Sequence, residues 1–182
     1  MASINSDILS PGMDIISFHL RDPYGNEYNE QSLKGNRGLL VVFTCNHCPY
    51  AKAIWPRFIK LADEIFKKGI NSVAINPNIH PDYPDDSPEK MKDAIKELGI
   101  NFPYLIDETQ HVAKAFQAQC TPDIYLYNEE LRLFYHGRFD DNWQNPDLVK
   151  KEDLSGAVEL LLSQSNPPAE QNPSIGCSIK WK

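Results

Sequence analysis

The sequence has no long apolar run and no cluster of basic residues. Its longest purely apolar run extends from Leu39 to Phe43, whereas a membrane-spanning helix needs roughly 20 apolar residues. Residues 1–10 are polar, without a basic start or an apolar core, so we expect no secretory signal. Lys and Arg total 18 against 25 Asp and Glu, and this acidity argues against a nucleic-acid or anionic-membrane surface. We therefore expect a cytoplasmic protein with neither a nucleic-acid nor a membrane partner.

Cysteine is also scarce, with four residues among 182. Hydrophobic residues make up 41% of the chain, which is enough for a core that does not depend on disulfides. The length fits one domain, since domains typically have roughly 100–200 residues. In a reducing compartment, paired cysteines are more often catalytic or metal-binding than structural. We expect a single domain over residues 1–182, with its core over about 9–164 and a proline-containing tail over 165–182.

The order of the predicted elements indicates an α/β fold. The wholly apolar run 39–43 is typical of a strand that is buried on both faces. A strand, a helix and a second strand in succession imply a parallel pair with a right-handed crossover. The last two strands form an antiparallel hairpin, which gives a mixed central sheet with helices on both faces. The predicted strands are 39–43, 70–75, 102–106, 123–127 and 131–136, after a hairpin within 16–28; the predicted helices are 49–68, 88–98, 109–116 and 152–162; and 163–182 has no obvious element.

The strongest chemical signal is the Cys-x-x-Cys pair Cys45 and Cys48, which follows the buried strand and opens a helix. Functional sites of open α/β sheets form at this edge, and a helix N-terminus favours a thiolate. We therefore expect the pKa of Cys45 to fall from ~8.5 to ~3.5–7.5, so that Cys45 attacks a substrate and Cys48 resolves the mixed disulfide. Two packed core cysteines or half of a zinc site are the alternatives. Zinc usually takes four ligands in two close pairs, and Cys120 and Cys177 form no second pair.

Several segments resemble the thioredoxin superfamily, beginning with Cys45-Asn46-His47-Cys48-Pro49-Tyr50 after the apolar strand. More narrowly, the chain resembles the peroxiredoxin-like proteins grouped with alkyl hydroperoxide reductase/thiol-specific antioxidant domains, over nearly its whole length. This resemblance implies a thioredoxin fold with an N-terminal β-hairpin and a peroxiredoxin-like insertion. The other segments that carry the resemblance are Tyr83–Glu89, Phe102–Gln110, Cys120–Asp123 and Gly176–Trp181.

Pro122 matches the cis-proline that faces the active cysteines in thioredoxin folds, and the resemblance therefore implies a cis Thr121–Pro122 bond. An ordinary turn proline is the alternative. The strand that starts at 123 runs antiparallel to 39–43, which places Thr121 at the edge where Cys45 lies. We therefore expect the Thr121 backbone to pair with an extended substrate strand.

The chain also departs from the families that it resembles. Leu39 stands where thioredoxins carry a buried carboxylate, so the usual internal base is missing, and Thr44 stands where they carry Trp. Neither cysteine of the pair has the Pro-x-x-x-Thr/Ser-x-x-Cys spacing of peroxiredoxins, which argues against specialised peroxide activation. Asp82, Asp85 and Asp86 follow the second parallel strand, and a solvated helix-entry loop is a better interpretation of them than a cation site.

The remaining candidates surround the cysteine pair. Asn46 and Thr44 are supporting residues, and His47 is either an imidazolium that stabilises a thiolate or a solvated residue at the helix start. Cys120 lies near the same edge, as a buried inert thiol or a third redox partner. Cys177 lies in the tail, within a reach of up to ~45 Å from the last helix, as a bystander or a further partner.

We interpret the chain as a thiol-disulfide oxidoreductase or antioxidant protein that acts on protein or small-molecule disulfides. A cellular dithiol restores its cysteines, and we expect neither a bound cofactor nor a metal. One alternative is a thiol peroxidase in which Cys45 becomes a sulfenic acid and Cys48 condenses with it. The other is a non-catalytic metal-binding or interaction module.

Overall fold

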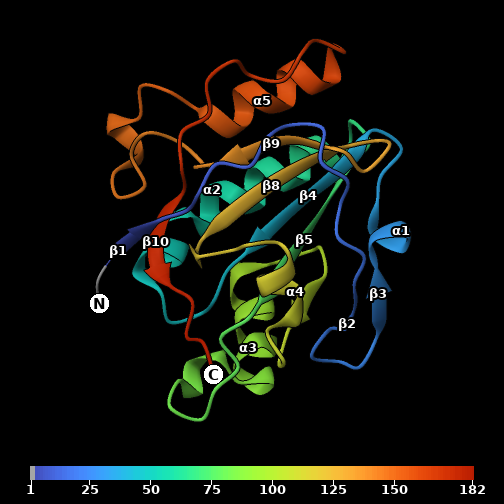
Figure 1. Ribbon diagram of the computed structural model, residues 1–182. Helices are drawn as coiled ribbons and strands as arrows, with labels where there is room; N and C mark the ends of the chain where they lie inside the picture. The colour runs from blue at the N-terminus through green and yellow to red at the C-terminus, as the bar shows by residue number, and fades with distance from the viewer. Residues whose placement is uncertain (1–2) are drawn as a thin grey trace.

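A mixed seven-stranded sheet forms the centre of the protein, in a computed structural model that describes residues 3–182. The strand order is β3-β2-β6-β5-β4-β8-β9 (Figure 1). β4 and β5 have the predicted places, and the N-terminal hairpin and the last hairpin are confirmed. The strands are β2 (His19–Arg21), β3 (Glu27–Asn29), β4 (Gly38–Phe43), β5 (Ile70–Asn76), β6 (Tyr104–Ile106), β8 (Asp123–Asn128) and β9 (Leu133–Gly137).

β4 lies between β5 and β8, parallel to the first and antiparallel to the second. Phe43 pairs with Asp123, so the carboxyl end of β4 lies beside the segment that precedes β8. This register confirms the predicted edge, at which Cys45 follows one strand and Thr121 and Pro122 precede the other.

Helices cover both faces of the sheet, as predicted. Successive residues of a strand point to opposite faces, so Leu40 and Val42 of β4 pack with residues of α2 and α5, whereas Val41 and Phe43 pack with residues of α4. Fully burying a side chain of this size contributes about 1.5–3 kcal/mol. The helices are α1 (Glu30–Leu33), α2 (Pro49–Phe66), α3 (Pro88–Leu98), α4 (His111–Ala115) and α5 (Asp153–Leu162), with short turns η1 (Pro84–Asp86) and η2 (Pro146–Leu148).

Local sequence signals set the ends of the helices. α3 begins after Ser87, whose side chain accepts a backbone N–H of the first turn, and ends at Gly99, whose φ of 68° is readily adopted by glycine. α2 begins at Pro49 with Cys48 as its N-cap residue. The second cysteine of the pair therefore lies at the positive end of a long helix.

A second, three-stranded sheet corrects the prediction for the tail. Its order is β1-β10-β7, from β1 (Ser3–Asn5), β10 (Ile175–Ser178) and β7 (Cys120–Thr121). The prediction that 163–182 contains no element is wrong, because β10 forms by pairing with two segments that lie far away in the sequence. Figure 1 shows β10, in red, next to β1 and the first turn of α2.

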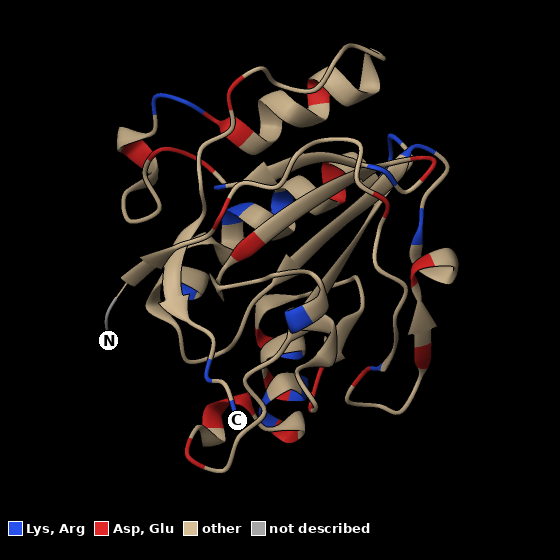
Figure 2. Ribbon diagram, viewed as in Figure 1, with Lys and Arg blue, Asp and Glu red and all other residues tan. Residues whose placement is uncertain are grey.

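The surface carries charges of both signs. On α2 and α3, Lys and Arg lie among Asp and Glu (Figure 2). None of the helices within residues 3–182 is both long and apolar enough to cross a membrane.

Candidate active site

Cys45 and Cys48 lie in the turn that connects β4 to α2. Both side chains are fully buried, and they form a small cluster with Ala51 and Cys177. All four cysteines of the chain are free thiols. The fold therefore brings the two predicted cysteines together and adds a third from the far end of the chain.

Thr121 contacts both sulfurs of the pair. Its side-chain oxygen lies 3.3 Å from Cys45 Sγ, and its carbonyl oxygen lies 3.0 Å from Cys48 Sγ. The thiol form of Cys48 donates to this carbonyl, which can only accept. The Thr121–Pro122 peptide bond is cis, so that prediction is confirmed.

The pKa values of the two thiols move in opposite directions. Burial, the contact with Cys48 and the charge of Asp86 raise the pKa of Cys45 well above its usual range. Hydrogen bonds with Cys45 and Cys177 and with the backbone of Ala51 lower the pKa of Cys48, against the effect of burial. These directions place the lowered pKa on Cys48, whereas the sequence predicts it for Cys45. The N-cap position belongs to Cys48, whereas Cys45 lies before the helix and beside a carboxylate.

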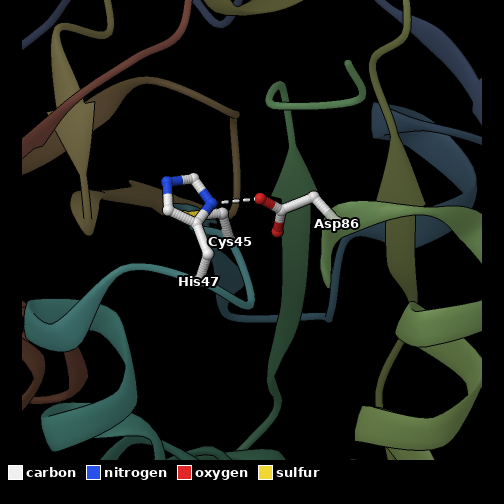
Figure 3. Close-up of side chains that lie close together, drawn as sticks. All are labelled: Cys45, His47 and Asp86. Carbon is white, nitrogen blue, oxygen red and sulfur yellow. Dashed lines mark hydrogen bonds and ion pairs between the residues drawn. The ribbon is translucent and has the colours of Figure 1, made fainter. Parts of the chain in front are cut away.

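That carboxylate belongs to Asp86, at the end of η1. Asp86 is fully buried, so the prediction of a solvated loop is wrong at this position. Its oxygens accept hydrogen bonds from Asn46 N at 2.5 Å and Asn76 Nδ2 at 3.1 Å, and also bond His47 Nδ1. Figure 3 shows His47 and Asp86 facing each other beside Cys45. The internal carboxylate that is missing from β4 is thus supplied by another segment, and the loop pattern contains no signal for it.

His47 is enclosed between Asp86 and Tyr83. Its side chain is only 9% exposed, and its ring stacks on Tyr83 with the centroids 4.9 Å apart. Its Nε2 atom is buried and has no hydrogen-bond partner among residues 3–182. The interpretation of His47 as a solvated residue is therefore wrong, because η1 and its neighbours cover the turn.

Two further predicted residues hold the turn in place. The Asn46 amide donates to Asp85 O at 2.8 Å, and its carbonyl accepts from Tyr104 at 3.1 Å. The buried Thr44 donates its backbone N–H to Ile75 O at 2.9 Å. These bonds fix the backbone on both sides of Cys45.

Cys45, His47 and Asp86 bring three metal-ligating atoms within 4.8 Å of one another. Zinc accepts all three ligand types, but structural zinc sites take four ligands. Both oxygens of Asp86 are already hydrogen-bonded, so a metal ion would have to displace those bonds. The arrangement fits an anchored carboxylate beside a thiol better than a closed zinc site.

The two candidate third thiols have different surroundings. Cys177 Sγ lies 3.0 Å from Cys48 Sγ. Cys120 Sγ instead lies 3.4 Å from the Pro122 carbonyl oxygen, and burial raises the pKa of Cys120. β10 also pairs Cys177 with Thr121. The tail therefore occupies the backbone position at which the sequence predicts an open edge for a substrate strand.

Comparison with known proteins identifies the family. Residues 11–136 match the family described as AhpC/TSA. The chain belongs to the AhpC/TSA family. The thiol-disulfide oxidoreductase ResA of Halalkalibacterium halodurans is 27% identical over 118 residues, a match that covers 65% of this AhpC/TSA chain. The chain spans less than two thirds of the length of the curated relatives that it matches, with 62% of this ResA and 64% of the one from Bacillus subtilis.

Solved structures share the architecture of this AhpC/TSA protein. A conserved protein from Geobacillus kaustophilus has a TM-score of 0.94 and 41% identity, over 100% of this chain and 97% of that one. A thiol:disulfide interchange protein of the thioredoxin family from Chlorobium tepidum has a TM-score of 0.64 and 17% identity, over 84% and 98%. The chain therefore has the thioredoxin fold that the resemblance implies.

Proposed function

We propose that this AhpC/TSA protein is a thiol-disulfide oxidoreductase whose Cys45 and Cys48 cycle between two thiols and a disulfide. The observation that carries the proposal is the contact of both sulfurs with Thr121 at the edge of the sheet. The ResA relatives are named thiol-disulfide oxidoreductases, which supports the same chemistry here. Protein or small-molecule disulfides are the substrates, and a cellular dithiol is the electron donor.

The first step is the attack of a thiolate on the substrate disulfide. A bond forms between the protein sulfur and one substrate sulfur, and the other substrate sulfur leaves as a thiolate. We assign this attack to Cys48, because its pKa is the lowered one and its N-cap position favours negative charge. The prediction from sequence gives this role to Cys45, so the two assignments differ in which sulfur forms the mixed disulfide.

The second step releases the substrate. Cys45 attacks the Cys48 sulfur of the mixed disulfide, the Cys45–Cys48 bond forms, and the second substrate sulfur leaves. Cys45 must lose a proton for this attack, and a carboxylate oxygen of Asp86, which can accept it, lies within 4.8 Å of its sulfur. The substrate gains two electrons and two protons, and a dithiol reductant later returns the same number to the protein.

Trapping the mixed disulfide tests the proposal and the order of attack. Variants are made in a Cys177→Ser background, so that only one contacting pair of thiols is present, and are mixed with oxidised glutathione. We expect Cys45→Ser to hold glutathione on Cys48, and the background protein to form the Cys45–Cys48 disulfide. If glutathione is held on Cys45 in the Cys48→Ser variant, and not on Cys48 in the Cys45→Ser variant, then Cys45 attacks first and the assigned order is wrong. Failure of the background protein to form the disulfide would refute the proposed function.

The cluster of Cys45, His47 and Asp86 favours one second candidate, a metal-binding module. Metal analysis of protein purified without chelator separates the two functions. The oxidoreductase predicts no stoichiometric zinc, whereas zinc that is bound one-to-one and lost in Asp86→Asn would favour the metal-binding module. The peroxidase alternative is tested by peroxide consumption, which we expect to be no faster than that of free cysteine at a matched thiolate fraction.

A further inference from the structure

The tail of the chain takes the place of a substrate strand. β10 pairs antiparallel with β7 in the register Cys177 to Thr121, and the pairing continues with a bond from Ile179 N to Gln119 O at 3.1 Å. An extended peptide that adds to a sheet edge makes this kind of backbone pairing. The position beside Thr121, next to both active-site sulfurs, is thus filled by residues of the same chain.

The fit of β10 at this position depends on a glycine. A Cβ atom on Gly176 would lie 2.2 Å from the Thr121 carbonyl oxygen, a distance at which the strand could not remain in place. Beyond the strand, Lys180 N donates to Asn78 Oδ1 at 2.8 Å, and Gln110 Nε2 donates to Lys180 O at 2.7 Å. Because β10 also pairs with β1 over Ile175 to Cys177, the segment is anchored on both sides of Cys177.

β10 presents its cysteine directly to the reactive pair. Cys177 is 1% exposed, and its sulfur lies 3.0 Å from Cys48 Sγ. Cys48 therefore has a thiol neighbour on its own turn, Cys45, and another on the strand that occupies the substrate position. Cys120 belongs to the same small sheet but has its sulfur against a carbonyl oxygen instead.

We propose that β10 is an internal substrate strand and that Cys177 is a third redox thiol, which exchanges with Cys48 to form a Cys48–Cys177 disulfide. This inference rests on the proposed function, because the Cys45–Cys48 disulfide supplies the bond that is exchanged. The observation that carries this inference is the contact between Cys48 and Cys177 of the tail, which is separate from the contacts with Thr121 that carry the proposed function.

The exchange is balanced without another reactant. The Cys177 sulfur attacks the Cys48 sulfur of the Cys45–Cys48 disulfide, the Cys48–Cys177 bond forms, and Cys45 leaves as a thiolate that takes up the proton lost by Cys177. No net oxidation or reduction occurs. In the dithiol state, burial and the contacts with Cys48 raise the pKa of Cys177. The contribution of a charged Cys48 disappears once Cys48 is bonded to Cys45.

The new disulfide would close the site. It links β10 covalently to Cys48, the N-cap residue of α2, so the backbone of Thr121 stays paired with the tail. A substrate strand can then reach Thr121 only after Cys48–Cys177 has been reduced. The oxidised protein would then remain in a closed form, with a Cys48–Cys177 disulfide and Cys45 as a free thiol.

Disulfide mapping tests the inference. The full chain, Cys45→Ser and Cys177→Ser are equilibrated with oxidised and reduced glutathione, free thiols are alkylated in acid-quenched samples, and the disulfides are located by peptide mass analysis. We expect most oxidised Cys45→Ser to carry Cys48–Cys177, and the wild-type chain to form Cys45–Cys48 first and Cys48–Cys177 later. Cys120→Ser is the matched control and is expected to behave as the wild type.

The outcomes separate this inference from the proposed function. The inference is overturned if neither the wild type nor Cys45→Ser forms a Cys48–Cys177 disulfide. If Cys45–Cys48 still forms in the wild type and in Cys177→Ser, the proposed oxidoreductase function stands. Absence of Cys45–Cys48 in Cys177→Ser refutes the oxidoreductase itself. Because the wild-type time course needs no substitution, a variant that fails to fold does not remove the test.

Discussion

Replacing Asp86 by Asn should lower the pKa of Cys45, because it removes a buried negative charge from beside that sulfur. Asn has nearly the same shape, and its carbonyl oxygen can still accept from Asn46 N. Coulomb's law, applied at the upper limit of 4.8 Å with an effective dielectric constant of ~20, gives about 3.5 kcal/mol. This energy corresponds to ~2.5 pKa units. The hydrogen bond from His47 offsets part of the negative charge of Asp86. We therefore expect the measured pKa of Cys45 to fall by ~1–2 units.

The assay is the pH dependence of iodoacetamide modification at Cys45. It is measured in a Cys48→Ser background, so that one active-site thiol titrates, and the alkylated residue is identified by mass. The rate rises as pH increases through the pKa, so Asp86→Asn should move this rise to lower pH. Asp85→Asn is the matched control, because it removes an equal charge from an exposed neighbour and should leave the profile in place. An unchanged or higher pKa in Asp86→Asn would refute the electrostatic reasoning.

Three further substitutions test the packing around the site and elsewhere in the fold. Gly176→Ala forces a Cβ against the Thr121 carbonyl, so we expect a loss of about 1–3 kcal/mol in urea unfolding and faster alkylation of the tail cysteine. Asp123→Ala leaves the buried His136 Nε2 without the hydrogen-bond partner that lies 2.9 Å away, and a loss of about 1–3 kcal/mol in the free energy of unfolding is expected. Gly99→Ala has open space around its new Cβ but keeps a positive φ, so its cost should be only about 1–2 kcal/mol, and a loss of several kcal/mol would contradict this argument.

The central layer of the fold can be predicted from local patterns. The apolar run of β4, the hydroxyl and proline before α3 and the glycine after it each act over a few residues, and each element forms where the pattern predicts it. Local patterns do not predict the strands of the second sheet, β1, β7 and β10, because none of them has an apolar run of its own. They are strands only because 3–5, 120–121 and 175–178 pair with one another across most of the chain.

The candidate site likewise has one part that the sequence predicts and one part that it does not. Cys45, Cys48 and the cis bond before Pro122 follow from spacing and resemblance. The pKa values of the two thiols do not follow from the sequence, because they depend on which cysteine caps α2 and on where Asp86 is buried. Both depend on contacts between segments that no local pattern records.

Reversible formation of the Cys45–Cys48 bond is the most direct test of the account. The Cys177→Ser protein is equilibrated with graded ratios of oxidised and reduced dithiothreitol, quenched with acid and mapped by mass. The account predicts a single reversible two-electron transition that protects Cys45 and Cys48 from alkylation together. If both thiols remain alkylatable at every ratio, the cysteine pair is not a redox centre and the account is contradicted.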